Sequence, residues 1–243
     1  EERARGPGEL PPAVLVALQL LHHRALGPRS AFDPYLRSLP KSFDELPLFW
    51  GEAELRMLEG TLVHQDTVLL RERLRVEHAV LRPALPPGGA SFEDWQWARA
   101  VVLSRAYKVA GTYRLIPLLD MGNHDDSTPY AVFGSEGEHF PEGTSIFVAA
   151  KSYNEGDEVF SRYGNLRTWQ KLFSFGYTPL APLTTTATSA ANARKEWRRS
   201  GVEDLLGGSA AWAAPLDGAV DLSPEMAEKT GGRFSFNCQS NVH

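Results

Sequence analysis

The spacing of the apolar residues changes near residue 105, and this change constrains the fold more than any other feature. Before it, apolar residues recur at helical spacing, as at Val14, Leu18 and Leu21. After it, short apolar or alternating runs are separated by Gly, Pro, Asn and Asp, which is typical of strands joined by turns. The pattern therefore predicts an α+β chain with a helical layer first and a strand-rich part after it.

Three longer helices are predicted in the helical layer. The first covers 13–26, before the Gly27-Pro28 stop, and the second runs from about Thr61 to Leu81. The third begins after Ser91, because an N-cap serine followed three residues later by Asp94 is a capping-box pattern. The shorter elements expected here are a helix over 52–60 and a Pro-punctuated connector over 32–50.

Four strand-like runs and two further helices are predicted in the rest of the chain. The expected strands are YRLIPLL (113–119), YAVF (130–133), TSIFVAA (144–150) and DEVFSRY (157–163). A short helix within 165–176 should end at Gly176, and another within 189–201 should end at Gly201. The Ser104-Arg105-Ala106-Tyr107 segment is expected to end the last helix of the helical layer.

Bulk properties exclude several classes of protein. The net charge is −5 and no long basic tract occurs, so nucleic acid is not an expected partner. Cys238 is the one cysteine, so no internal disulfide can form, and no apolar run approaches the length of a membrane span. We expect a soluble intracellular protein. The opening EERARGPGELPP lacks Met and a signal-peptide pattern, so we expect a fragment with a loose segment over 1–12.

Gly122-Asn123-His124-Asp125 resembles a loop that holds metal in dimetal phosphoesterases. Such a centre needs about six to eight ligands from several strand ends. The chain has no Asp-x-His, and Phe160 stands where the Gly-Asp-x-x-Asp pattern requires its second Asp. The single cysteine and scattered histidines do not have the ligand spacing of a zinc site. No metal is therefore expected, and a metallophosphoesterase is kept only as an alternative.

A second interpretation rests on the order of several motifs. They are Ser104-Arg105-Ala106-Tyr107, the Pro-x-x-Asp-x-x-Asn-His of 117–124, the Gly-Asp-Glu-Val-x-x-x-Tyr-Gly of 156–164, and Phe175-Gly176-Tyr177. Upstream stand Pro34-Tyr35-Leu36 and Leu46-Pro47-Leu48-Phe49-Trp50. In this order the motifs resemble the SET-domain protein methyltransferases, in the branch of the enzyme that methylates the Rubisco large subunit. The resemblance covers about 13–180 and continues more weakly to about 222.

The resemblance implies a SET-domain β-fold of small twisted sheets with a large helical insertion. It implies a SET domain over 13–180, divided into the insertion at 13–110 and the SET core at 111–180. The start of a helical substrate-binding domain would follow over 181–243.

The resemblance also implies an S-adenosylmethionine-dependent protein-lysine N-methyltransferase. In such an enzyme a neutral lysine amine attacks the sulfonium methyl in line, and the family assigns the tyrosine beside the methyl to Tyr163. Alignment of the reacting groups can contribute about 7–11 kcal/mol. The implied partner is a protein that carries the target lysine, or a histidine in one branch, and we expect a monomer.

Further residues match family positions. Asn123 and His124 would bind the cofactor, with Phe175 and Tyr177 beside the adenine. The positions that line the substrate-lysine side are Arg105, Asp120 and Tyr130.

Several departures from the family pattern support an alternative function. The family's cofactor-binding Gly-x-Gly segment has no counterpart, because Gly6-Pro7-Gly8 lacks the strand that should follow it. Phe175 replaces the usual Tyr of Tyr-Gly-Phe, Arg167-Thr168 replaces the usual Asn-Ser or Ser-Asn, and Val109 replaces a basic residue. The missing Gly-x-Gly segment and the Phe175 substitution support the alternative function, a non-catalytic SET-like protein-binding module.

Overall fold

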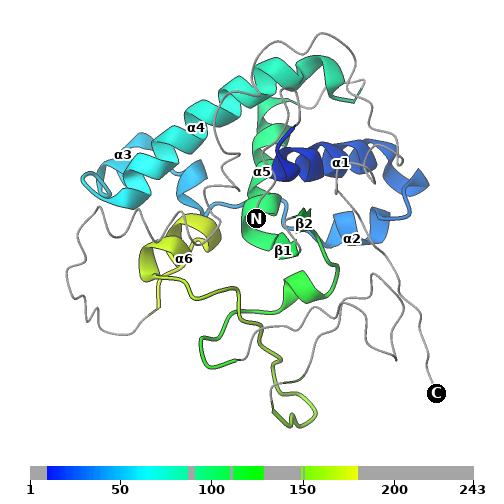
Figure 1. The fold of residues 1–243 in the computed structure, drawn as a ribbon, viewed down its shortest axis with the longest axis vertical. Helices are drawn as coiled ribbons and strands as arrows, with labels where there is room; N and C mark the ends of the chain where they lie inside the picture. The colour runs from blue at the N-terminus through cyan, green and yellow to red at the C-terminus, as the bar shows by residue number, and fades with distance from the viewer. Residues whose placement is uncertain (1–9, 87–90, 110–111, 129–148, 150, 180–243) are drawn as a thin grey trace.

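Helices dominate the chain as far as Arg105 (Figure 1). The structure is a computed structural model that describes residues 10–86, 91–109, 112–128, 149 and 151–179. The helices of this part are α1 (Pro12–Leu26), α2 (Asp33–Ser38), α3 (Glu52–Arg56), α4 (Leu62–Leu81) and α5 (Phe92–Arg105). They are followed by β1 (Tyr107–Val109), β2 (Thr112–Arg114) and α6 (Thr168–Phe175), with short 3-10 helices at Gly27–Arg29, Pro47–Phe49, Arg82–Ala84 and Leu119–Met121.

The core is built around α1 and α5, which pack against each other. Val14 and Leu18 of α1 and Trp95 of α5 are fully or almost fully buried. Tyr113 of β2 and Phe173 of α6 join the same cluster, so the helical layer and the later elements share one hydrophobic core. Burial of this apolar area is the main force that holds them together.

A buried ion cluster joins α4 to α5. Glu77 is fully buried, and its carboxylate accepts hydrogen bonds from Arg99 at 3.0 Å and from Arg73 at 3.3 Å. Two donors compensate for the cost of burying this charge, which would otherwise be large. The cluster therefore fixes how α4 lies against α5.

Two of the signals at the predicted helix ends are confirmed. Ser91 Oγ accepts from Asp94 N at 3.1 Å, and Asp94 Oδ2 accepts from Ser91 N at 3.0 Å, which forms the capping box of α5. Gly176 ends α6 in the left-handed region at φ 76°. The helix predicted over 52–60 is shorter, since α3 ends at Arg56, and the helix predicted within 189–201 lies outside the described residues.

The strand predictions need correction. β1 and β2 form an antiparallel pair in which Tyr107 is opposite Arg114, so Tyr107 begins a strand and does not end the last helix. Only Tyr113 and Arg114 of the predicted strand 113–119 lie in β2. Pro117 has no N–H for a sheet ladder, Leu118 has φ 71°, and a 3-10 helix then forms at Leu119–Met121.

Residues 157–163 were also predicted to form a strand, but the structure describes them and they do not form one. This segment makes a single parallel bridge, between Ser161 and His124. The predicted strands 130–133 and 144–150 lie outside the described residues, except for Ala149. The α+β prediction is confirmed in part, since the described residues are largely helical and contain one small sheet.

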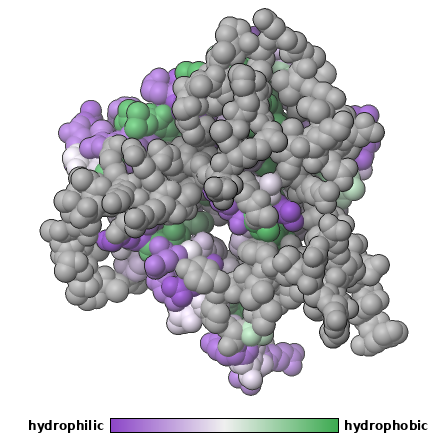
Figure 2. Space-filling view, in the orientation of Figure 1, coloured by the Kyte–Doolittle hydropathy of each residue, from purple (hydrophilic) through white to green (hydrophobic). Residues whose placement is uncertain are grey.

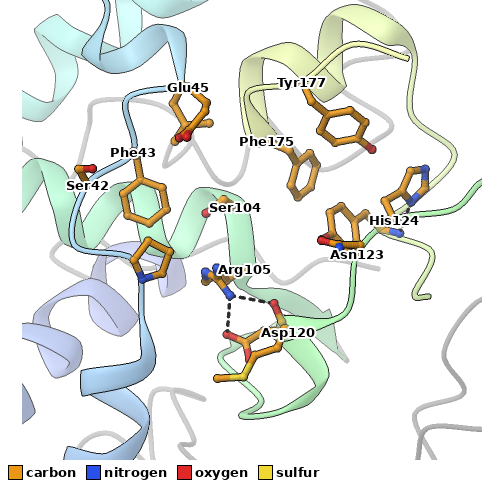
Figure 3. A pocket seen from close by; sticks show the side chains of 14 residues that line it. Ser42, Phe43, Glu45, Ser104, Arg105, Asp120, Asn123, His124, Phe175 and Tyr177 are labelled. Atoms are coloured by element: carbon orange, nitrogen blue, oxygen red, sulfur yellow. Dashed lines mark hydrogen bonds and ion pairs between the residues drawn. The ribbon is translucent and has the colours of Figure 1, made fainter. Parts of the chain in front are cut away.

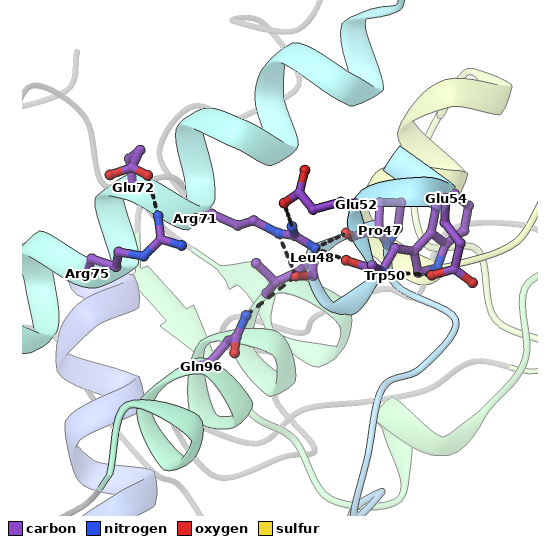
Figure 4. A network of polar contacts seen from close by, with 10 residues as sticks. Pro47, Leu48, Trp50, Glu52, Glu54, Arg71, Glu72, Arg75 and Gln96 are labelled. Carbon is purple, nitrogen blue, oxygen red and sulfur yellow. Dashed lines mark hydrogen bonds and ion pairs between the residues drawn. The ribbon is translucent and has the colours of Figure 1, made fainter. Parts of the chain in front are cut away.

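The predicted connector over 32–50 contains α2 and a 3-10 helix. Arg71 of α4 bonds the backbone of the part of the connector around that 3-10 helix (Figure 4). Arg71 of α4 donates to the carbonyl oxygens of Leu48 at 2.9 Å and Pro47 at 3.2 Å, and it also bonds the carbonyl of Trp50. Gln96 of α5 donates to the Leu48 carbonyl from the other side at 3.4 Å. These bonds satisfy the Leu48 and Trp50 carbonyls and add a second donor to the Pro47 carbonyl, which also accepts from Trp50 N at 3.2 Å.

The described surface mixes hydrophilic and hydrophobic residues (Figure 2). Exposed apolar side chains include Leu69 and Val76 of α4. In the described part of the chain, no helix has the length and apolar character needed to cross a membrane.

Candidate functional site

A cavity of about 490 Å³ lies where the connector, α5, the 3-10 helix at Leu119–Met121 and the end of α6 meet (Figure 3). Its volume is within the range of small-molecule sites. The lining residues are Pro40, Ser42, Phe43, Glu45, Leu46, Ser104, Arg105, Asp120, Met121, Asn123, His124, Tyr163, Phe175 and Tyr177. Chain segments that are far apart in sequence therefore build one site.

The Asn-His segment pairs with the segment that leads to Tyr163. Ser161 N donates to Asn123 O at 2.7 Å, and Asp125 N donates to Ser161 O at 3.1 Å. The Asn123 side chain donates to Glu158 Oε1 at 2.6 Å. The two segments are 35 or more residues apart in sequence, and these bonds fix their register beside the cavity.

His124 is held on both of its ring nitrogens. Its Nδ1 accepts from Tyr163 N at 3.0 Å, and its Nε2 lies 2.8 Å from Asp126 Oδ1. Asp126 in turn accepts a hydrogen bond from Lys171 Nζ of α6 at 2.6 Å. The His124 side chain is 4% exposed, so its ring has a defined orientation at the cavity wall.

Tyr163 is packed between aromatic rings. Its ring centroid is 5.1 Å from that of His124 and 4.6 Å from that of Phe175. Its hydroxyl donates to Gly122 O at 2.9 Å. Burial is the largest cause that raises the pKa of Tyr163 above its ordinary value, and the nearby Tyr107 adds to the effect. The hydroxyl therefore remains neutral at physiological pH, where it can donate and accept hydrogen bonds.

Arg105 and Asp120 form the opposite part of the wall (Figure 3). Arg105 donates to Asp120 O at 2.9 Å and lies 3.6 Å from its carboxylate oxygen Oδ2. Tyr35 Oη donates to the same oxygen at 2.7 Å, whereas Oδ1 is buried without a partner. Burial raises the pKa of Asp120, although the Tyr35 hydrogen bond and the Arg105 charge act in the opposite direction.

The end of α6 completes the cavity with two aromatic residues. Phe175 and Tyr177 stand on either side of Gly176, and the Tyr177 hydroxyl is buried without a hydrogen-bond partner. A Cβ atom at Gly176 would lie 2.7 Å from the Cβ of Glu45 and 2.8 Å from its backbone. Glycine is therefore needed both for the positive φ and for the close contact with the connector.

Seven of the eight predicted site residues line this cavity. They are Arg105, Asp120, Asn123, His124, Tyr163, Phe175 and Tyr177. Tyr130 lies outside the described residues. The structure brings the seven together, and the individual roles assigned to them remain predictions.

The connector residues on the cavity wall were not predicted as site residues. Pro40, Ser42, Phe43 and Glu45 belong to this group. Trp97 of α5 holds that wall by donating from Nε1 to Pro40 O at 2.8 Å. One sequence signal could have pointed to this wall. The Pro34-Tyr35-Leu36 motif lies just before it, and Tyr35 donates a hydrogen bond to Asp120.

The hydrogen bonds of His124 bear on the metal interpretation. A metal bound through either nitrogen would have to displace Tyr163 N or Asp126. The described residues contain no group of three or more His, Cys, Asp or Glu side chains placed to hold a metal ion.

Sequence comparison relates the chain to actin-histidine N-methyltransferases. It is 30% identical over 167 residues to that of Danio rerio, and the match covers 62% of this chain and 27% of that protein. The Mus musculus and Homo sapiens proteins match over the same shares at 28% and 25% identity. The chain thus spans about a quarter of the length of these relatives. No protein-family model matches it.

Structural comparison identifies the fold. Rubisco LSMT bound to AdoMet superposes with a TM-score of 0.60 at 23% identity, covering 71% of this chain and 41% of that one. Rubisco LSMT bound to sinefungin and monomethyllysine superposes with a TM-score of 0.58 at 22% identity, covering 68% of this chain and 38% of that one. The resemblance predicted from the motif order is confirmed. The described fold is that of the Rubisco LSMT SET domain, and the chain is related in sequence to actin-histidine N-methyltransferases.

Proposed function

We propose that this chain is part of an S-adenosylmethionine-dependent protein methyltransferase that modifies a lysine side chain. One observation carries the proposal. Tyr163, the Asn123-His124 pair and the Arg105-Asp120 pair come from separate segments and line one cavity. Their order along the chain matches the motif order of the SET-domain enzymes, and the fold agrees with that of Rubisco LSMT.

The cavity has the chemical features that the cofactor needs. Phe175 and Tyr177 offer aromatic surface for an adenine ring, and aromatic rings stack with about 0.5–1.5 kcal/mol beyond their area burial. The buried Tyr177 hydroxyl has no hydrogen-bond partner among the described residues, so a ligand atom would satisfy it. Asn123 and His124 stand nearby and would hold the methionine part through backbone and side-chain groups.

Tyr163, whose ring packs between His124 and Phe175, suits the methyl-transfer step. When bound, S-adenosylmethionine would supply a methyl group from its sulfonium and leave as the neutral thioether S-adenosylhomocysteine, and the methylated amine would give one proton to solvent. Tyr163 Oη and the Gly122 carbonyl, 2.9 Å apart, provide oxygen atoms for weak C–H···O contacts with that methyl. The partly buried wall lowers the cost of keeping a lysine amine neutral, and a neutral amine is the nucleophile.

A histidine acceptor is the second candidate. It is supported by the sequence comparison, since the relatives at 25–30% identity are actin-histidine N-methyltransferases. Lysine is supported by the structural comparison, since LSMT SET-domain structures with the same fold are bound to lysine or methyllysine. Both acceptors attack through a neutral nitrogen, so the site chemistry is shared.

The non-catalytic alternative rests on the sequence departures. Phe175 occupies the position of a family tyrosine, but its ring still packs on Tyr163 at 4.6 Å. The aromatic wall is therefore retained. The substitution removes a hydroxyl and leaves the apolar surface.

The test combines cofactor binding with product identification. The full-length protein is titrated with S-adenosylmethionine by calorimetry, and is then incubated with labelled cofactor and a cell lysate. Mass spectrometry of the labelled proteins should find new methyl groups on lysine, or on histidine if the second candidate is right. Absence of cofactor binding at near-millimolar concentration would overturn the enzyme proposal. Binding without any methyl transfer would favour the non-catalytic module.

A further inference from the structure

A chain of hydrogen bonds connects α6, through Asp126 and the cavity residue His124, to the backbone of Tyr163. Lys171 Nζ donates to Asp126 Oδ2 at 2.6 Å, and Asp126 Oδ1 lies 2.8 Å from His124 Nε2. Tyr163 N then donates to His124 Nδ1 at 3.0 Å. Lys171 and Asp126 are not among the residues that line the cavity, so they would act on it through His124.

This geometry determines the protonation of the His124 ring. A backbone N–H can only donate, so Nδ1 must carry a lone pair to accept from Tyr163. The ring proton must then be on Nε2, where it is donated to Asp126. A second proton on Nδ1 would point at the Tyr163 N–H and break that contact.

Lys171 is needed because a carboxylate alone favours a positively charged imidazole. Its side chain is 4% exposed, and a lysine so deeply buried is rare unless it is paired. The ammonium offsets the carboxylate charge on the side away from the ring. Its hydrogen bond is the largest of the causes that lower the pKa of Asp126.

Other titratable groups near the ring do not replace this pair. Asp125 Oδ1 accepts from Ser127 N and Ser127 Oγ, both at 2.7 Å, and Lys151 and His124 both act on its charge without a hydrogen bond to it. The Tyr177 ring is 6.4 Å from the His124 ring. Among the described residues, Asp126 is the carboxylate that contacts the imidazole.

We propose that Lys171 and Asp126 are positioning residues that keep His124 neutral with its proton on Nε2, so that Nδ1 fixes the Tyr163 backbone at the cavity wall. The consequence for cofactor binding and methyl transfer rests on the proposed function. The protonation state of His124 does not, and it can be measured separately.

The first measurement is spectroscopic. Long-range proton–nitrogen correlation spectra of the protein labelled with nitrogen-15 histidine distinguish the two neutral tautomers from the imidazolium, and His124→Gln identifies the signals. The native protein should show the Nε2–H tautomer at neutral pH. Lys171→Met should shift His124 towards the imidazolium, because the unpaired carboxylate then attracts a second proton.

Removing the charge of Asp126 should reverse the effect of Lys171→Met on His124. Asp126→Asn keeps an oxygen that can accept from Nε2 but removes the negative charge, and Asp126 is 61% exposed, so the fold should tolerate the change. The double variant Lys171→Met with Asp126→Asn should return His124 to the neutral tautomer. A lysine that only filled space would not be rescued in this way.

The second measurement is the dissociation constant for S-adenosylmethionine by calorimetry. Lys171→Met should raise it about tenfold, the loss expected for one charge-assisted hydrogen bond, and the double variant should recover most of that loss. Arg37→Met is the control, because it removes the exposed partner of the Asp33 ion pair on α2. It should leave both measurements unchanged.

The inference is overturned if His124 in the native protein is not the Nε2–H tautomer. It is equally overturned if Lys171→Met leaves the His124 signals as they are. If the native protein shows the expected signals but binds no cofactor, the proposed function fails and the positioning of His124 stands.

Discussion

Tyr35 Oη donates a 2.7 Å hydrogen bond to Asp120 Oδ2 and so links α2 to a residue 85 positions later in the chain. Both residues are buried. Arg105 also contacts Asp120, donating to its backbone carbonyl and pairing with its carboxylate. The helical layer therefore orients an acidic side chain at the cavity. Residues of the helical layer therefore contribute directly to the arrangement of the site.

Tyr35→Phe should destabilise the protein by about 1.5–3 kcal/mol, the range for a hydrogen bond to a charged group. The reason is that the Asp120 carboxylate would remain buried with one partner fewer. Urea unfolding at pH 7 measures the loss in the free energy of unfolding. This loss should be smaller at pH 4, where more of the Asp120 carboxyl is protonated. An unchanged midpoint at pH 7 would contradict the contact.

The pKa of Asp120 is raised by burial, so its contribution to stability depends on pH. A carboxyl whose pKa is higher in the folded than in the unfolded state favours folding below the unfolded value of about 3.9. That contribution is lost as the pH rises through the folded pKa. The stability of the native protein relative to Asp120→Asn should therefore fall between pH 4 and pH 7. A difference that grows with pH would show that the ion pair with Arg105 outweighs burial.

Tyr163→Phe should keep the fold and lower methyl transfer by about 100-fold or more, as when a hydrogen-bonding group at a reaction centre is removed. Loss of the bond to Gly122 O should cost stability only about 0.5–1.5 kcal/mol, because the ring contacts with His124 and Phe175 remain. Initial rates at saturating cofactor, with the melting temperature measured in parallel, separate these effects. Full retained activity would exclude the role assigned to Tyr163.

His124→Ala should weaken cofactor binding by about tenfold or more, since it removes a cavity residue and frees the Tyr163 backbone N–H. The dissociation constant should change more than the rate at saturating cofactor. His64→Ala serves as a matched control, because His64 lies in the first turn of α4 and does not line the cavity. Equal affinities of the two variants would contradict the assignment.

Gly176→Ala should destabilise the protein by about 2–4 kcal/mol, through a left-handed conformation combined with a steric clash. The added Cβ would lie 2.7–2.8 Å from Glu45 atoms, which include its backbone. Gly60 also has a positive φ, at 81°, but nothing lies within 4 Å of the position that a Cβ would take there, so Gly60→Ala should cost only about 1–2 kcal/mol. Chemical denaturation of both variants tests the difference, and equal losses would mean that the Glu45 contact is not rigid.

Local signals in the sequence determined the longer helices and their ends. The capping pair Ser91 and Asp94 forms as predicted, and Gly176 ends α6 as predicted. These features depend on residues within one or two turns of each other, so the sequence carries them directly. The order of the motifs likewise identified the family resemblance and the seven described cavity residues before their positions were known.

Contacts between distant segments decided the rest. The apolar run LIPLL was expected to be a strand, but Pro117 and the positive φ of Leu118 interrupt it, and the 3-10 helix that follows at Leu119–Met121 presents Asp120 to Tyr35 and Arg105. Periodicity alone could not show this, because a short buried apolar run fits several conformations. Lys171, too, is simply one residue of an amphipathic helix until the tertiary fold brings it to Asp126. The sequence by itself determined which side chains are available and where the helices begin and end, whereas their burial and pairing were decided by the tertiary structure, because both depend on segments that meet only when the chain has folded.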